Sequence, residues 1–157
     1  MKTCFIVSSE KELALRGNEY EEPFVTVKKE LGDVLRSLYS KGYQRFITGA
    51  EWGIPLWAGE MLVNLRTQHP DIMVTIIIPY EEQAKDWFEY QRDRYFKLHQ
   101  DADEVILLHT HWCETAEEDA LAYALEQSDL LFVFGKPEDD LQAVQLANDL
   151  NVKTTYI

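Results

Sequence analysis

The fold is decided by the stretch Arg45-Phe46-Ile47-Thr48-Gly49-Ala50-Glu51-Trp52-Gly53-Ile54-Pro55-Leu56-Trp57-Ala58-Gly59-Glu60. A short apolar run leads into two glycines, and from Ile54 onward the apolar residues recur at helical spacing. The pattern predicts a strand, a tight turn and a helix. Gly49 and Gly53 suit a backbone that takes a positive φ or lies close to a ligand. Pro55 fits the first helical turn, where its missing N–H costs nothing.

A turn of this kind directs free backbone N–H groups and the positive end of a helix dipole at one point, which suits a phosphate or a carboxylate. The same glycine spacing also fits a tight strand-to-helix connection that binds nothing. At this turn the sequence has neither the Gly-Lys-Ser/Thr of a P-loop nor Gly-x-Gly-x-x-Gly. The turn is therefore a candidate anion site without a standard phosphate-binding motif.

Strands and helices alternate outward from this stretch. Apolar runs predict strands at 2–7, 44–48, 73–78, 103–108, 130–134 and 153–157. Helical spacing predicts helices from 23 to before 42, at 54–68, within 81–100, at 114–127 and through 141–150. The pattern predicts an α/β fold in one domain, 1–157: a doubly wound, mostly parallel sheet with helices on both faces.

The charge of the chain is strongly and unevenly negative. The formal net charge is −13, and residues 81–157 contribute most of it, with 6 Lys/Arg against 18 Asp/Glu. Proteins that bind polyanions normally present a basic face. Non-specific nucleic acid binding and acidic membrane surfaces are therefore disfavoured.

The cysteines and the first residues of the chain indicate the cellular compartment of the protein. Cys4 and Cys113 lie far apart and give no disulfide framework, which favours a reducing cytoplasm. The opening apolar run is interrupted by Ser8-Ser9-Glu10, too early for a signal peptide, and no run reaches the length of a membrane span. We expect a cytoplasmic protein.

The predicted strand ends supply further candidate site residues, because ligands of open α/β sheets bind outside the carboxyl ends of the strands. We expect no metal, although His109, His111 and Cys113 would share a face of an extended chain, since Zn²⁺ sites usually draw ligands from separated segments. The candidate ligand-binding residues are Ser8, Ser9, Thr48, Gly49, Ala50, Glu51, Trp52, Gly53, Pro79, Tyr80, Gly135 and Lys136.

The central stretch, the strand end Ile78-Pro79-Tyr80 and the segment Glu82-Gln83-Ala84-Lys85-Asp86-Trp87 resemble the YpsA-like DUF1273 (UPF0398) family. This family belongs to the SLOG superfamily of Rossmann-like domains, together with the LOG phosphoribohydrolases and the DNA-processing protein DprA. The resemblance runs through nearly the whole chain. It implies a cytoplasmic nucleotide-binding domain with a nucleotide-derived ligand, ADP-ribose- or NAD-like, at the turn Gly49–Gly53.

One part of the chain departs from the LOG pattern. LOG enzymes carry a second glycine-rich loop, Gly-Gly-x-Gly-Thr, whereas the equivalent place here reads Gly135-Lys136-Pro137-Glu138-Asp139-Asp140. Three carboxylates there would repel a phosphate. The departure disfavours LOG-type hydrolysis, and Glu51 and Glu60 are the acids to test for it.

Three functions remain open from the sequence. The favoured one is a non-catalytic sensor or regulatory domain that binds a nucleotide-derived ligand, with no other cofactor. The second is a hydrolase of the N-glycosidic bond of a nucleotide, with Glu60 or Glu51 as general acid or base. The third is an interaction module or homodimer, in which the acidic second half and the aromatic segment 87–98 dock a protein partner.

Overall fold

The computed structural model describes residues 1–9, 18–135 and 141–156. In these ranges the strands are β1 (Lys2–Ser8), β2 (Tyr43–Thr48), β3 (Met73–Tyr80), β4 (Glu104–His109), β5 (Leu130–Phe134) and β6 (Lys153–Tyr156). The helices are α2 (Phe24–Ser40), α3 (Ile54–Arg66), α4 (Glu89–Asp101), α5 (Ala116–Glu126) and α6 (Gln142–Asp149). None of these helices combines the length and apolar character that a bilayer crossing requires.

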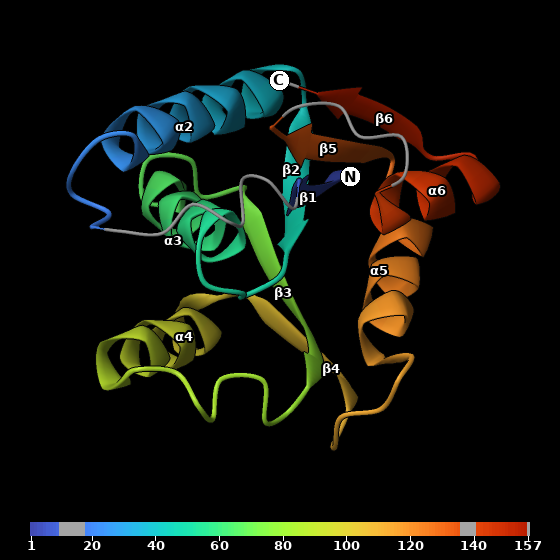
Figure 1. Ribbon diagram of the computed structural model, residues 1–157. Helices are drawn as coiled ribbons and strands as arrows, with labels where there is room; N and C mark the ends of the chain where they lie inside the picture. The colour runs from blue at the N-terminus through green and yellow to red at the C-terminus, as the bar shows by residue number, and fades with distance from the viewer. Residues whose placement is uncertain (10–17, 136–140, 157) are drawn as a thin grey trace.

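All six strands run parallel in one sheet of order β4-β3-β2-β1-β5-β6. The chain adds β2, β3 and β4 on one side of β1, then crosses back through α5 to place β5 on the other side. Because crossovers between parallel strands are right-handed, this reversal puts the later helices on the opposite face. Figure 1 shows α2, α3 and α4 on one side of the sheet and α5 and α6 on the other. The predicted doubly wound α/β fold is confirmed.

The sheet is apolar on both faces because each face has its own helical layer. In β2, Phe46 belongs to the core beneath α2, α3 and α4, whereas its neighbour Ile47 belongs to the core beneath α5 and α6. Both side chains are at most 1% exposed. This double coverage explains the uninterrupted apolar runs from which the strands were predicted.

The aromatic residues before and within α4 are divided between the core and the surface. Tyr95 and Leu98 are buried, and the partly buried Trp87 packs against the same core cluster. Gly59 of α3 lets α4 come close, because a Cβ added there would lie 2.8 Å from Leu98 Cδ2. The structural interpretation of this stripe as core is confirmed for Trp87, Tyr95 and Leu98, whereas Phe88, Tyr90 and Phe96 are exposed.

Candidate ligand-binding site

The candidate site lies where the strand order reverses. β1 has β2 on one side and β5 on the other, so the chain winds away from β1 in both directions. In open α/β sheets this switch point, outside the carboxyl ends of the strands, is where ligands bind. A cavity of about 310 Å³ lies there, close to the lower limit of about 300 Å³ for small-molecule pockets.

Five segments of the chain line this cavity: β1, the turn after β2 with the start of α3, the end of β3, and the first turns of α5 and α6. The described lining residues are Phe5, Ile6, Val7, Ser8, Gly49, Glu51, Pro55, Ile77, Pro79, Glu117, Ala120, Leu121, Leu141, Gln142 and Ala143. Most of the wall is therefore apolar, and a few polar groups stand out on it.

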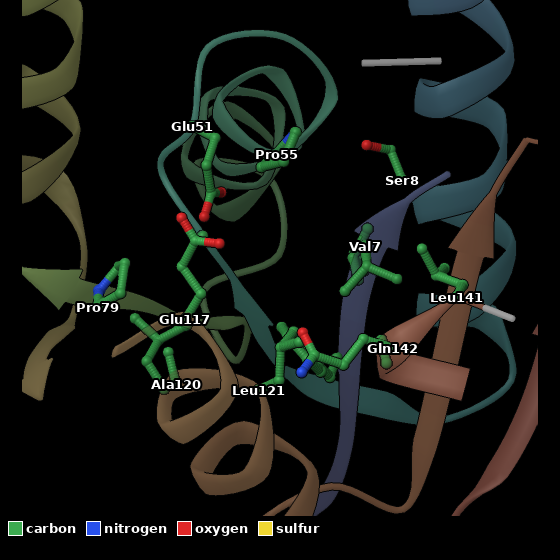
Figure 2. Close-up of a pocket in the computed structure, with 15 residues that line it drawn as sticks. Val7, Ser8, Glu51, Pro55, Pro79, Glu117, Ala120, Leu121, Leu141 and Gln142 are labelled. Carbon is green, nitrogen blue, oxygen red and sulfur yellow. The ribbon is translucent and has the colours of Figure 1, made fainter. Parts of the chain in front are cut away.

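Two carboxylates face each other across the cavity. Figure 2 shows Glu51, from the turn after β2, and Glu117, from the first turn of α5, with their carboxylates pointing toward one another. The Glu51 carboxylate folds back over Gly49, since a Cβ at that glycine would lie 2.0 Å from Glu51 Oε2. Gly49 is thus required so that this carboxylate can lie against the backbone.

The surroundings of Glu51 favour its neutral form. Desolvation by burial raises the pKa of Glu51, and the negative charge of Glu117 raises it further. Hydrogen bonds oppose this shift, among them one donated by Gln83 Nε2 to Glu51 Oε1 at 3.4 Å. Gln83 is itself positioned by the buried Tyr95, whose hydroxyl donates to Gln83 Oε1 at 3.3 Å.

A charged Glu51 should therefore destabilise the folded protein. Because its pKa is higher in the folded than in the unfolded state, the free energy of unfolding falls as the pH rises between those two values. Glu51→Gln has no proton to lose, so we expect it to melt about 2–4 °C higher than the wild type at neutral pH, a gain of about 1 kcal/mol. Melting curves across the pH range test this. The difference in melting temperature between the variant and the wild type must disappear below the ordinary pKa of glutamate. A constant difference at every pH would contradict the assignment.

Two buried serine residues lie at the carboxyl end of β1. Ser8 is 6% exposed and lines the cavity, and Ser9, 0% exposed, follows it. The backbone N–H of Ser9 donates to the carbonyl of Phe134 at 3.1 Å. Neither side-chain hydroxyl has a hydrogen-bond partner among the described residues. An unpaired buried hydroxyl costs free energy, so the Ser8 hydroxyl is suited to a ligand that fills the cavity.

The turn itself is built as the sequence indicates. Gly53 has φ 111° and immediately precedes α3, and no side chain within 1–9, 18–135 or 141–156 caps that helix. The buried Thr48 donates its hydroxyl to the carbonyl of Pro55 at 3.1 Å, which ties the strand end to the first helical turn. Ala50 is buried in the core.

The other candidate residues have different surroundings. Pro79 lines the cavity, whereas Tyr80 is partly exposed and pairs with His109 of β4. Gly135 follows β5 with φ 117°. Lys136 lies outside the described residues.

Trp52 and Glu60 turn away from the cavity toward α4. The Trp52 ring packs edge-on against Tyr90, with a centroid separation of 5.6 Å, and Arg94 Cζ lies 4.8 Å from the Trp52 ring centroid. Arg94 donates to both carboxylate oxygens of Glu60, at 2.9 and 2.6 Å, and also to Glu19. Glu60 therefore anchors α3 to α4, and of the two acids proposed for catalysis only Glu51 lines the cavity.

The main residue that the sequence analysis missed is Glu117. Of the acids in the first turn of α5, Glu117 enters the cavity, while Asp119 bonds His109. Leu121, Leu141 and Gln142 were also missed. The usable signal was that a helix following a parallel strand begins at the carboxyl edge of the sheet, beside the predicted site.

The histidines after β4 do not share a face. His111 lies 3.2 Å from Glu82 with its Nδ1, whereas His109 Nε2 lies 2.7 Å from Asp119 Oδ2. Cys113 lies near His109 and Asp119, and these three carry ligand atoms of the types that bind metals, all within 4.8 Å of one another. The extended arrangement considered from the sequence is absent here, because a bend follows His109.

Comparisons with known proteins agree with this fold. The UPF0398 protein of Halalkalibacterium halodurans is 30% identical over 79 residues, which cover 50% of this chain and 42% of that protein. The UPF0398 protein YpsA of Bacillus subtilis is 27% identical over 116 residues, covering 73% of this chain and 64% of that protein. The matched part is thus less than two thirds of either relative.

A solved structure shows the same fold at low sequence identity. DNA processing protein A from Helicobacter pylori, known for a single-stranded DNA binding mode, is similar with a TM-score of 0.62 over 99% of this chain and 64% of that one, at 13% identity. The model of the YspA SLOG family (YpsA) matches residues 9–151. Since that match spans nearly the whole sequence and the relatives carry the same family name, the chain belongs to the YspA SLOG family.

Proposed function

We propose that this chain binds a nucleotide-derived small molecule, ADP-ribose- or NAD-like, in the cavity at the switch point, and that it works in the cytoplasm as a sensor or regulatory binding domain. One observation supports this most: a cavity at the switch point combines the buried Ser8 hydroxyl, which has no partner in the described part of the chain, with two facing carboxylates on an otherwise apolar wall. Few polar groups on an apolar wall are typical of small-molecule sites.

The two carboxylates suit the ribose of such a ligand. A carboxylate accepts hydrogen bonds, and a ribose offers neighbouring hydroxyls that donate them; an acidic side chain binds ribose in the same way in Rossmann dinucleotide sites. The turn Gly49–Gly53 remains the centre of the site. We place the ribose rather than a phosphate against it, because the Glu51 carboxyl group occupies the space over Gly49 and, when ionised, would repel an anion.

A phosphate fits better at the opposite end of the cavity. The first turn of α6, with Gln142 and Ala143 on the cavity wall, has no acidic residue and no side-chain cap among the described residues, whereas the acids that precede it in the sequence, Glu138, Asp139 and Asp140, oppose a phosphate there. Its free N–H groups and the hydroxyl of Ser8 donate to phosphate oxygens. In Figure 2, Gln142 lies across the cavity from Glu51. The base then packs on apolar wall residues such as Leu121.

A hydrolase acting on the N-glycosidic bond is the second candidate, because two carboxylates with one raised pKa are the groups that such chemistry uses. Its acids would be Glu51 and Glu117, since Glu60 is paired with Arg94. Release of free base from a bound nucleotide, lost in Glu117→Gln and kept in Glu60→Gln, would favour the enzyme. Binding without release of base favours the sensor.

The acidic docking surface has less support. Of the three acids in the first turn of α5, Glu117 lines the cavity and Asp119 pairs with His109, which leaves Glu118 for such a surface. Single-stranded DNA, which the Helicobacter pylori protein binds, is also disfavoured as a ligand here by the net charge of −13.

A thermal-shift panel tests the binding proposal. With ADP-ribose, NAD, AMP and cyclic dinucleotides at millimolar concentration, we expect at least one to raise the melting temperature by about 5–10 °C, since a ligand at a hundred times its Kd stabilises by about 2.7 kcal/mol. The 2′-deoxy form of an active ligand should give a smaller shift, because it lacks a hydroxyl for the carboxylates. No shift with any of the four would contradict the proposal.

A further inference from the structure

A second cluster of functional groups lies at the carboxyl end of β4, outside the cavity. His109 is the last residue of β4, Cys113 lies in the following loop, and Asp119 lies in the first turns of α5. Their potential ligand atoms, an imidazole nitrogen, a thiol sulfur and a carboxylate oxygen, all lie within 4.8 Å of one another. The bend after His109 brings them together although Asp119 is only ten positions further along the chain.

We propose that His109, Cys113 and Asp119 form a binding site for a divalent transition metal ion, Zn²⁺ by its chemistry, with a fourth position open to water. The donor set decides the metal class. Thiolate and imidazole favour Zn²⁺ and its neighbours in the first transition row over Mg²⁺ and Ca²⁺, which prefer oxygen ligands alone.

The geometry is close to what Zn²⁺ requires. Bonds of about 2.0–2.3 Å in a tetrahedron separate neighbouring ligand atoms by about 3.3–3.8 Å. The His109 Nε2 to Asp119 Oδ2 distance is 2.7 Å, and no pair in the cluster exceeds 4.8 Å. The separation between His109 Nε2 and Asp119 Oδ2 must widen slightly, and Cys113 Sγ must move closer to both atoms. Rotation of the side chains can produce both changes.

A proton currently joins two of the three ligands. The Nε2–H of His109 donates to Asp119 Oδ2; for Nε2 to bind a metal ion this proton must move to Nδ1, so that the neutral imidazole ligates as its other tautomer, and the Cys113 thiol releases its proton to solvent. Thr115 already holds the carboxylate, since its hydroxyl donates to Asp119 Oδ2 at 3.0 Å. Such an outer contact orients a ligating carboxylate.

The third ligand is weakly engaged and accessible. Cys113 Sγ has a 3.7 Å contact with Thr115 Oγ1, longer than a strong hydrogen bond, and its residue is only partly buried. The side chains of His109 and Asp119 are 35% and 43% exposed, which leaves a path for an ion. Metal binding would fasten the edge strand β4 and its loop to α5.

Two residues outside the cluster serve as controls for a test of metal binding. His111, two residues from His109, is directed toward Glu82 rather than into the cluster. The second cysteine, Cys4, is 0% exposed, and burial raises the pKa of its thiol to about 12, so it does not compete for alkylating reagents.

The test measures alkylation of Cys113 by iodoacetamide in the full chain, with and without Zn²⁺, by peptide mass spectrometry. We expect one equivalent of Zn²⁺ to slow the reaction at least about tenfold. His109→Gln and Asp119→Asn should lose this protection and His111→Gln should keep it. Circular dichroism checks that each variant is folded.

Cobalt gives an independent measurement. Co²⁺ bound by Cys113 should show thiolate-to-cobalt charge transfer in the near ultraviolet, absent in Cys113→Ser. Protection that persists in both His109→Gln and Asp119→Asn would show adventitious binding by the thiol alone and would overturn the proposal. So would unchanged alkylation in the wild type. Neither result bears on the nucleotide proposal, because the cluster and the cavity share no residue.

Discussion

Leu121→Trp is expected to abolish ligand binding and to raise the Kd for any ligand active in the thermal-shift panel at least about a hundredfold. Leu121 lies on α5 and lines the cavity, where it is only partly buried. A tryptophan there extends into a space of about 310 Å³ and takes the volume that the base would occupy. A hundredfold change corresponds to about 2.8 kcal/mol of lost binding free energy.

Isothermal titration calorimetry measures this change, with Tyr123→Trp as the matched control. Tyr123 lies two residues further along α5, is 37% exposed and does not line the cavity. Both variants should keep the wild-type melting temperature to within a few degrees, because Leu121, although it packs against the core, borders the open cavity, and Tyr123 is exposed. Wild-type affinity in Leu121→Trp would place the ligand elsewhere.

Arg94→Met should be strongly destabilising, by about 2–3 kcal/mol. Arg94 joins two acids, with two bonds to Glu60 and one to Glu19, whose side chain is only 10% exposed. These contacts raise the pKa of Arg94 above its ordinary value. Removing one partner of a buried ion pair costs about 3–5 kcal/mol, and we expect less here because the side chain of Glu60 is 33% exposed and Glu19 keeps Lys28.

Thermal unfolding should show the loss as a fall of about 5–10 °C in melting temperature. Arg92→Met is the control, since Arg92 lies on the same helix and is also partly buried, but has one bond to the carbonyl of Lys85 and no ion pair among the described residues. An equal fall in melting temperature in the two variants would show that the ion pairs of Arg94 add no more to stability than the single bond of Arg92. The comparison also tests the structural role given to Glu60 in place of a catalytic one.

The sequence was sufficient for the fold because each strand carries its own signal. The run in β3 is apolar at nearly every position, as in a strand covered on both faces, and the switch to helical spacing at Ile54 marks the start of α3. Pro55 and Gly53 fix that boundary through backbone requirements that need no tertiary information.

Which residues form the site could not be predicted in the same way, because it depends on the order of the strands in the sheet. Local sequence patterns do not determine that order. Glu117 is 66 residues from Glu51 in the chain and meets it because α5 returns across the sheet. Glu60 follows the turn closely in sequence, yet the helical period carries its side chain round to α4. Only the assembled sheet distinguishes these two acids.

The most direct measurement is a crystal structure of the chain with ADP-ribose or the most stabilising ligand of the panel. The proposal predicts ribose hydroxyls within hydrogen-bond distance of the Glu51 and Glu117 carboxylates, and a phosphate near Ser8 and the first turn of α6. A ligand bound outside this cavity, or with its phosphate against Glu51 and its ribose in solvent, would contradict the central claim.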